Sequence, residues 1–173
     1  MTHRIVLAGS SGLIGRALET ELQARGAEVY HLVRRDPRTK NEQRWSPERG
    51  EIDEATLAGV DAVISLNGAS VGHLPWTKSY RRLLRDSRID ATRTIATAVS
   101  RLGSEAPRAW LSASAVGFYG DRPAEVLTES SAGGDTFLAR LCVEWEAEAL
   151  TAAADRIGHG SRCPTRCGAF CMR

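Results

Sequence analysis

The chain of 173 residues is long enough for one domain with a sizeable core, and its composition, 42% hydrophobic and 25% charged, is that of a soluble globular protein. A net charge of +2 excludes bulk attraction to nucleic acid or to a membrane surface. No apolar run is long enough to span a bilayer, and no signal peptide precedes the first apolar segment, so we expect a cytoplasmic protein.

The first predicted element is a buried strand over residues 4–8, which runs into a glycine-rich loop and then a helix. The glycines follow the spacing G-x-x-G-x-x-G, in which Gly9 allows a sharp turn, Gly12 leaves room for a pyrophosphate and Gly15 lets the helix pack closely. The free N–H groups of the helix start would face the phosphates. The predicted cofactor-binding residues are therefore Gly9, Ser10, Ser11, Gly12, Leu13, Ile14 and Gly15, and the alternative is an ordinary turn before a helix.

This helix is expected to turn one apolar side inward, formed by Leu13, Ile14, Ala17, Leu18 and Leu22. Gly26 ends it, and residues 28–33 form a second strand. Arg34 and Arg35 follow where a dinucleotide-binding unit meets the adenosine ribose, and a guanidinium there suits a 2′-phosphate. We therefore favour NADP(H) over NAD, although Asp36 could serve a ribose hydroxyl, and one of the arginines could be only a solvated charge.

Further strands are predicted over residues 43–45 and 60–66, with a short helix capped by Asp53 between them. The second of these strands runs into small and polar residues that would lie close to the cofactor, Asn67, Gly68 and Ala69, or would form a simple turn.

A long helix is predicted over residues 76–102 because apolar residues recur there in steps of three and four. Its other side is charged, and we expect a solvated face with i,i+4 ion pairs, formed by Arg81, Arg82, Arg85, Asp86, Arg88, Asp90 and Arg93.

The next strand covers residues 109–112 and ends in small hydroxylic residues, among them Ser112 and Ser114, which are typical of the edge of an active site, with Ser112 expected near the cofactor. A helix over residues 136–154 follows, in which Cys142 and Trp145 are expected in the core.

Alternating strands and helices imply right-handed crossovers and a mostly parallel sheet, whose ligand crevice lies outside the carboxyl ends of the strands. Four separate segments reach that edge, namely Gly9–Gly15, Arg34, Asn67 and Ser114. The predicted fold class is α/β, a Rossmann-type doubly wound parallel sheet in three layers.

These segments resemble the extended short-chain dehydrogenases/reductases, the NAD-dependent epimerase/dehydratase superfamily, and within it the branch labelled epimerase family protein or sugar-nucleotide epimerase. The resemblance covers roughly residues 4–157, through Gly9–Gly15, residues 59–64, Ser87-Arg88-Ile89, residues 112–121 and residues 141–146. It implies a Rossmann-type fold, a bound NAD(P) and redox or epimerase chemistry on a nucleotide sugar or a small carbonyl compound.

The resemblance also implies a serine beside a Tyr-x-x-x-Lys pair, in which the lysine lowers the pKa of the tyrosine. Ser114 matches the serine and is the candidate catalytic residue, but the helix carries Phe137 to Leu141, or Cys142 to Glu146, where the pair belongs. Conventional tyrosine-based catalysis is therefore not expected. The other functions to weigh are a non-catalytic NADP(H)-binding sensor or scaffold and a non-functional gene fragment.

The superfamily pattern stops near residue 157, without the last strands and the C-terminal substrate lobe that the resemblance implies. We assign residues 1–157 to the NAD(P)-binding domain and expect residues 158–173 to be a disordered or out-of-frame tail without a strand, or the end of a genuine short variant. Three of the four cysteines lie in this tail with C-x3-C-x3-C spacing, which is not that of a structural zinc site, so no metal is predicted. The unpaired sheet edge would favour a homodimer or aggregation.

Overall fold

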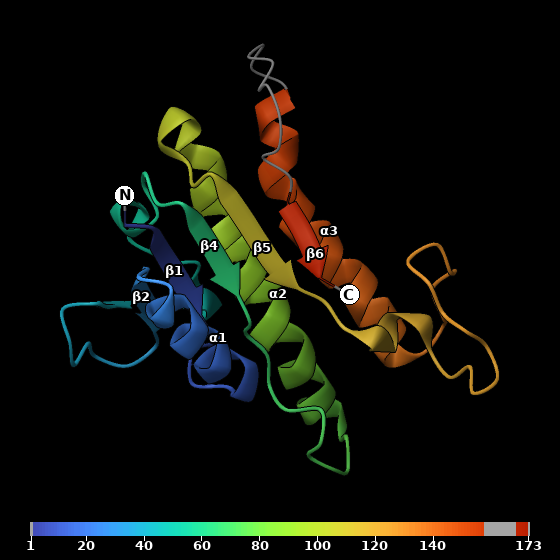
Figure 1. Ribbon diagram of the computed structural model, residues 1–173. Coiled ribbons are helices and arrows are strands. Elements are labelled where there is room, and N and C mark those ends of the chain that lie inside the picture. Colours follow the sequence, from blue (N-terminus) through green and yellow to red (C-terminus); the bar gives the residue numbers. More distant parts are fainter. Residues whose placement is uncertain (1, 158–168, 173) are drawn as a thin grey trace.

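The computed structural model describes residues 2–157 and 169–172, and side chains up to residue 152. Six parallel strands form one sheet in the order β3-β2-β1-β4-β5-β6. The strands are β1 (Arg4–Ala8), β2 (Glu28–Val33), β3 (Glu42–Arg44), β4 (Ala62–Ser65), β5 (Ala109–Ala113) and β6 (Ala169–Met172), and the helices are α1 (Leu13–Ala24), α2 (Lys78–Arg101) and α3 (Phe137–Ile157). This is the predicted Rossmann-type α/β fold (Figure 1).

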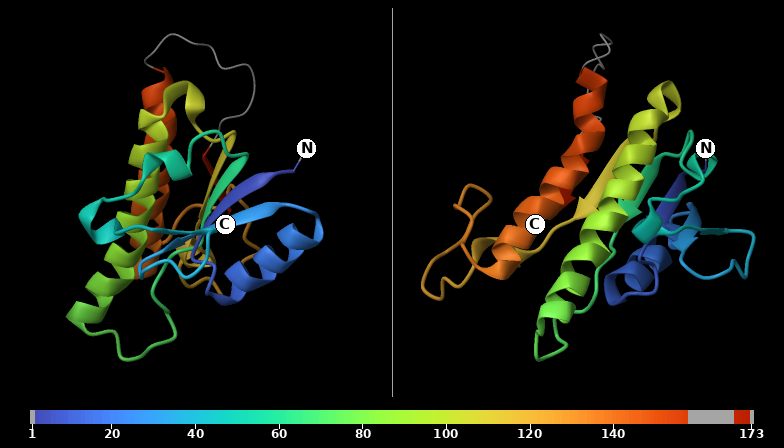
Figure 2. Two further views of the ribbon diagram at one scale, coloured as in Figure 1. Left: turned by 90° about the vertical axis from the view of Figure 1, so that its left-hand side faces the viewer. Right: turned by 180° about the vertical axis from the view of Figure 1, so that it is seen from behind.

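The sheet separates two layers of helices, with α2 and α3 on one face and α1 on the other (Figure 2, left). Alternation along β1 explains the layers: Val6 packs in the core on the α2 side, and Leu7 packs in the core on the α1 side. Both side chains are completely buried. Strands buried on both faces in this way are typical of parallel sheets, so β1 holds the centre of the molecule.

The α1 helix begins one residue after Gly12, as predicted, but its inward face is shorter than the sequence suggested. Leu18 and Leu22 pack against the core of the sheet. Leu13 and Ile14 are 82% and 68% exposed, so the prediction that they face inward is wrong. They stand at the first turn of the helix, beyond the end of β1, where no strand lies beneath them.

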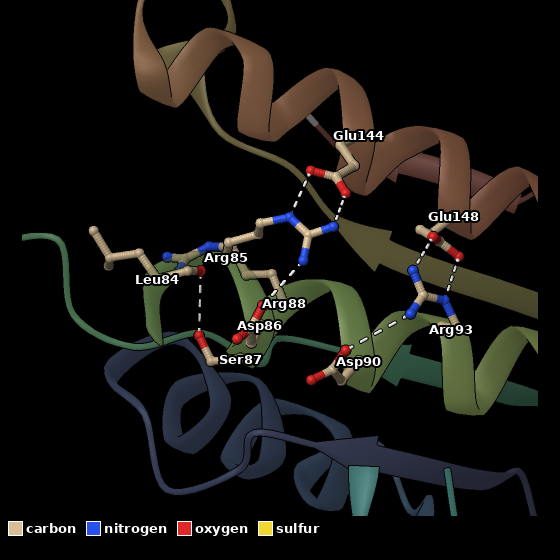
Figure 3. A network of polar contacts seen from close by, with 9 residues as sticks. All are labelled: Leu84, Arg85, Asp86, Ser87, Arg88, Asp90, Arg93, Glu144 and Glu148. Carbon is tan, nitrogen blue, oxygen red and sulfur yellow. Dashed lines mark hydrogen bonds and ion pairs between the residues drawn. The ribbon is translucent and has the colours of Figure 1, made fainter. Parts of the chain in front are cut away.

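The charged side of α2 is only in part the solvated face that its sequence predicted, since Arg81 and Arg82 are exposed but other charged residues contact α3 (Figure 3). Arg85 and Arg93 form ion pairs with Glu144 and Glu148 of α3, and these pairs join the two helices. Arg88 is half-buried and makes no ion pair within α2. Within α2 the ion pairs have other spacings than i,i+4, since Arg85 pairs with the adjacent Asp86 and Arg93 with Asp90 three residues before it. The further acidic partners come from a helix more than 50 residues along the chain.

The prediction that no strand follows residue 157 is also wrong, because β6 pairs in parallel with β5. The remainder of the predicted tail, residues 158–168 and 173, lies outside the described residues, and so do the side chains of its three cysteines. No helix in the described part of the chain is both long enough and apolar enough to cross a membrane.

Candidate dinucleotide-binding site

At two positions of the first loop, the packing of the backbone leaves no room for any residue other than glycine. Gly9 has a φ of +87°, and a Cβ atom added there would lie 2.8 Å from the backbone carbonyl of Leu66. A Cβ atom on Gly15 would lie 2.7 Å from the Cα atom of Ser10. Any side chain at either position would therefore collide with the main chain, which explains the sharp turn after β1 and the close approach of α1 to the loop.

Gly12 differs from these two because nothing within the protein requires a glycine there. Its φ of −72° and ψ of 169° suit any residue, it is exposed, and the nearest atom to an added Cβ is Gly9 O at 3.4 Å. Gly12 is also the N-cap of α1, and no side chain caps that end of the helix. By contrast, Thr77 caps α2 by accepting from the N–H of Tyr80 at 3.2 Å. The uncapped start of α1 is thus an exposed group of main-chain donors of the kind that binds phosphate.

A groove runs along the carboxyl edge of the sheet as two adjoining cavities of about 650 and 450 Å³. Arg34 and Asn67 line both cavities, so they mark the junction. The larger cavity is bordered by Gly9, Ser10 and Ser11 of the glycine loop and by the end of β2, whereas residues 12–15 do not line it. The smaller cavity is bordered by residues 67–69 and the first half of α2. Three of the four predicted binding segments therefore border one continuous groove.

The two arginines after β2 have different roles. Arg35 forms a two-pronged ion pair with Glu42, with Nη1–Oε2 and Nη2–Oε1 distances of 2.8 and 2.6 Å. The hydrogen bond from Arg35, assisted by the backbone N–H of Arg38, lowers the pKa of Glu42 to about 2. Asp36 is likewise held by Arg44, at 2.6 Å.

Arg34 is exposed, and within the described part of the chain no hydrogen bond or ion pair holds its side chain. It is therefore the one arginine of the pair that can turn toward a ligand in the groove. The sequence had left open which of the two would be only a structural or solvated charge, and the ion pair of Arg35 with Glu42 answers that question.

Sequence reasoning missed three groups that border the larger cavity: Arg16, Glu19 and His31. Arg16 donates from Nη1 to the Ser11 carbonyl at 2.9 Å and so supports the glycine loop from α1. Glu19 of the same helix lies 3.1 Å from Nε2 of His31 on β2. Arg16 could have been found from its place directly after Gly15, in the first turn of the helix. The pairing of Glu19 with His31 has no signal in the sequence.

The segment after β4 is held against α2. The N–H of Ala69 donates to Ser87 Oγ at 2.9 Å, and Arg88 Nη2 donates to the Ala69 carbonyl at 3.1 Å. A Cβ atom on Gly68 would lie 2.7 Å from the guanidinium carbon of Arg88, so Gly68 has a reason within the protein to be glycine. Asn67 donates to Ser65 Oγ at 3.0 Å. Residues 67–69 therefore form a fixed wall of the groove rather than a simple turn.

Arg88 is the central residue of this arrangement (Figure 3). Its Nη1 also donates to the Leu84 carbonyl at 2.9 Å, and its guanidinium lies 5.4 Å from the centroid of the Trp145 ring of α3. Burial lowers the pKa of Arg88 from its ordinary value. This one side chain therefore joins the loop after β4 to both long helices.

At the end of β5 the two predicted serines have different surroundings. Ser112 has no exposed surface, and its hydroxyl donates to the Ala113 carbonyl at 3.3 Å, so the structure gives a cofactor no atom of Ser112 to contact. Ser114 is half-buried and donates to Glu146 Oε1 at 2.6 Å. Cys142, one turn before Glu146 on α3, is 3% exposed, which confirms the prediction that it lies in the core.

The strand register places these segments at one edge. Ala8, the last residue of β1, pairs with Leu32 and with Ser65, and Ser65 pairs with Ser112. The residues that follow, Gly9, Arg34, Asn67 and Ser114, consequently leave the sheet at the same end. A glycine turn, an uncapped helix start and a groove at the carboxyl edge of a parallel sheet define a Rossmann-type domain.

Comparison with known proteins agrees with this class. The NAD dependent epimerase/dehydratase family matches residues 5–172. An epimerase family protein of Mycobacterium leprae is 41% identical over 148 residues, 86% of this chain. Among solved structures, a nucleoside-diphosphate sugar epimerase from Corynebacterium glutamicum is 36% identical with a TM-score of 0.74, covering 90% of this chain and 32% of that one. Human epimerase family protein SDR39U1 (isoform 2), solved with NADPH, is 29% identical with a TM-score of 0.73, covering 84% of this chain and 48% of that one.

The chain belongs to the NAD dependent epimerase/dehydratase family, since the match covers nearly all of it. It spans about half the length of the curated relatives it matches, 47% of the mycobacterial protein and 48% of human SDR39U1.

Proposed function

We propose that the groove at the carboxyl edge binds a nicotinamide dinucleotide, with NADPH preferred over NADH. The observation that carries this proposal is Gly12, an exposed glycine at an uncapped helix start that the protein does not need for its own packing. The pyrophosphate would lie against the main chain of residues 10–13, and Leu13 and Ile14 would border it. A human relative solved with NADPH supports the choice of ligand.

The preference for NADPH rests on Arg34. Its guanidinium borders the groove where the adenosine ribose is expected and, among the described residues, has only an electrostatic interaction with Glu48, whereas Arg35 is held by Glu42. A planar guanidinium can bind a 2′-phosphate through two parallel hydrogen bonds. Asp36, the carboxylate that follows the two arginines, is held by Arg44 and is therefore a weaker candidate for a ribose hydroxyl.

The bound dinucleotide would supply or accept hydride, and the protein would hold a substrate beside Ser114. We propose a nucleotide sugar or a small carbonyl compound as the substrate class, on the strength of the family and of the sugar-epimerase relative. A specific observation favours a second candidate, a domain that binds the cofactor without turnover: Cys142 and Glu146 stand beside Ser114 where a tyrosine and a lysine would be needed.

Titration calorimetry of the purified chain tests the proposal. We expect saturable binding of NADPH at a ratio of one to one, with weaker binding of NADH. Gly12→Val should weaken NADPH binding by about 100-fold or more, because the new side chain occupies the space of the pyrophosphate. Gly72→Val is the matched control, since Gly72 is also exposed and an added Cβ would lie 3.6 Å from its nearest neighbour. Equal NADPH affinity in the two variants would refute the proposed site.

A further inference from the structure

A cluster of side chains at the end of β5 stands at the same carboxyl edge of the sheet as the dinucleotide groove, although it does not line the two cavities described above. Ser114 donates to Glu146 Oε1 at 2.6 Å, a short distance typical of a hydroxyl that binds a carboxylate. Cys142 lies one turn earlier on α3 and donates from its thiol to the Ala115 carbonyl at 3.6 Å. The strand end and the helix therefore bring a hydroxyl, a carboxylate and a thiol together at the edge where the other loops converge.

Of these three groups, the carboxylate is the one that serves as a hydrogen-bond acceptor to its neighbour and so can take a proton from it. Burial raises the pKa of the Cys142 thiol, and the nearby carboxylate of Glu146 raises it further. Arg88 from α2 acts on the same thiol in the opposite direction and more weakly. Cys142 is consequently a neutral thiol that packs in the core. A proton that leaves the Ser114 hydroxyl therefore has one acceptor in hydrogen-bond contact with it in this cluster, the carboxylate of Glu146.

We propose that Glu146 is the proton acceptor and donor of this site and that it acts through the hydroxyl of Ser114. The inference rests on the proposed binding of a nicotinamide dinucleotide, which supplies the hydride half of the reaction. Because the Ser114 hydrogen already points to Glu146, the lone pairs of Ser114 Oγ are left to accept a hydrogen bond from a substrate hydroxyl.

The proton balance is simple for oxidation of an alcohol by the oxidised dinucleotide. Hydride leaves the carbinol carbon, the substrate O–H bond breaks, and its proton passes to Ser114 Oγ. At the same time the original Ser114 proton passes to Glu146, so the products are a carbonyl compound, the reduced dinucleotide and a neutral Glu146. In the reverse direction, neutral Glu146 returns its proton through Ser114 to the carbonyl oxygen.

A purely structural role for the same hydrogen bond makes a different prediction. If Glu146 only ties α3 to β5, the change Glu146→Gln should be harmless, because an amide oxygen also accepts from Ser114. If Glu146 carries the proton, that change should abolish proton transfer and leave the fold intact. Glu144→Gln is the matched control, since Glu144 lies on the same helix and pairs with Arg85 on the side facing α2.

The experiment uses the full chain and begins with NADPH titration, which tests the proposed function separately. Reduction of the probe carbonyls phenanthrenequinone and diacetyl is then followed by loss of NADPH across a range of pH. We expect Glu146→Gln to keep its NADPH dissociation constant and its melting temperature but to lose about 100-fold in rate. The pH dependence of the remaining rate should become flat, and Glu146→Asp should restore part of it.

Combining variants adds a second criterion. Because Ser114 and Glu146 act as a unit, Ser114→Ala with Glu146→Gln should be no slower than either change alone. The proposal is overturned if Glu146→Gln keeps the rate and pH profile of Glu144→Gln, or if it melts at a markedly lower temperature. It is also overturned if the natural chain binds NADPH but reduces neither probe. Absence of NADPH binding would instead refute the proposed function.

Discussion

At the β1 end of the carboxyl edge the exposed groups are main-chain atoms, whereas at the β5 end they are side chains that already bind one another. The uncapped start of α1 has no side-chain partner, and Gly12 is open to solvent. Near β5, Ser114 binds Glu146 and Arg88 binds Ala69. The first end is built to receive a ligand through backbone donors, and such donors survive almost any change of side chain.

The β5 end depends instead on which residues α2 and α3 carry. This difference teaches why a chain can keep the dinucleotide-binding features of its family while its proton chemistry changes. A helix substitution beside Ser114 alters the acid–base group and leaves the glycine loop untouched. The predictions below disturb one end at a time.

The largest effect is expected from Gly15→Val, which disrupts the packing of α1 against the loop after β1. Its side chain would collide with the backbone of Ser10, so the loop must move away from α1. We expect a loss of roughly 3 kcal/mol in the free energy of unfolding, measured by urea denaturation, together with loss of NADPH binding. Gly12→Val should lose binding with little loss of stability. If both variants are equally stable, the distinct roles assigned to the two glycines are wrong.

Arg88→Ala disrupts the side-chain contacts at the β5 end of the carboxyl edge. It removes two hydrogen bonds to backbone carbonyls and the contact with Trp145, at an expected cost of about 2 kcal/mol in unfolding free energy. Hydrogen exchange at the amide of Ala69 should quicken, since the wall formed by residues 67–69 loses its main anchor. Arg88→Lys keeps the charge but not the planar fork, and should recover only part of the loss. Unchanged exchange at Ala69 would contradict this account of the wall.

Arg34→Asp tests whether Arg34, and not Arg35, determines the preference for NADPH. Removing the cation and adding a negative charge should lower the ratio of NADPH to NADH affinity by about 30-fold, the value of one charge-assisted hydrogen bond pair. Arg35→Ala is the control: it should leave the ratio unchanged and act on stability through Glu42. Calorimetric titration of both cofactors measures the ratio, and equal ratios in the two variants would contradict the assignment.

The smallest effect concerns acid stability. Because Arg35 lowers the pKa of Glu42 from 4.5 to about 2, the folded state gains stability that is complete above about pH 4.5 and is lost as the pH falls toward 2. In Glu42→Gln the free energy of unfolding should fall less between pH 4.5 and pH 2. Above pH 6 it should differ from that of the natural chain by a nearly constant amount. A set of urea denaturation curves between pH 2 and 7 tests it, and an identical acid slope in both proteins would disagree with the ion pair described here.

The sequence predicted the β1 end better than the β5 end for a physical reason. Gly9 needs a positive φ, and Gly15 needs room for the nearby backbone of Ser10. Because these requirements are local, they appear in the sequence as a regular spacing of glycines. Arg85 and Arg93 also pair with acidic residues of α3, and helix periodicity cannot say which distant helix packs alongside. The inward direction assigned to Leu13 and Ile14 failed because the periodicity continues past the end of the strand beneath it.

The role of Glu146 was missed for a similar reason. Its i,i+4 spacing from Cys142 is visible in the chain, but its hydrogen bond to Ser114 spans 32 residues. Arg34 and Arg35 are adjacent and chemically alike, so only the position of Glu42 separates their roles.

Backbone NMR during NADPH titration tests the central claim most directly, because it reads the main-chain donors themselves. The account predicts that the amide signals of Ser11, Gly12 and Leu13 shift most and saturate together, while Gly59 and Gly103, which lie beyond the other edge of the sheet, do not move. Shifts centred elsewhere, or none in the glycine loop at saturating NADPH, would contradict it.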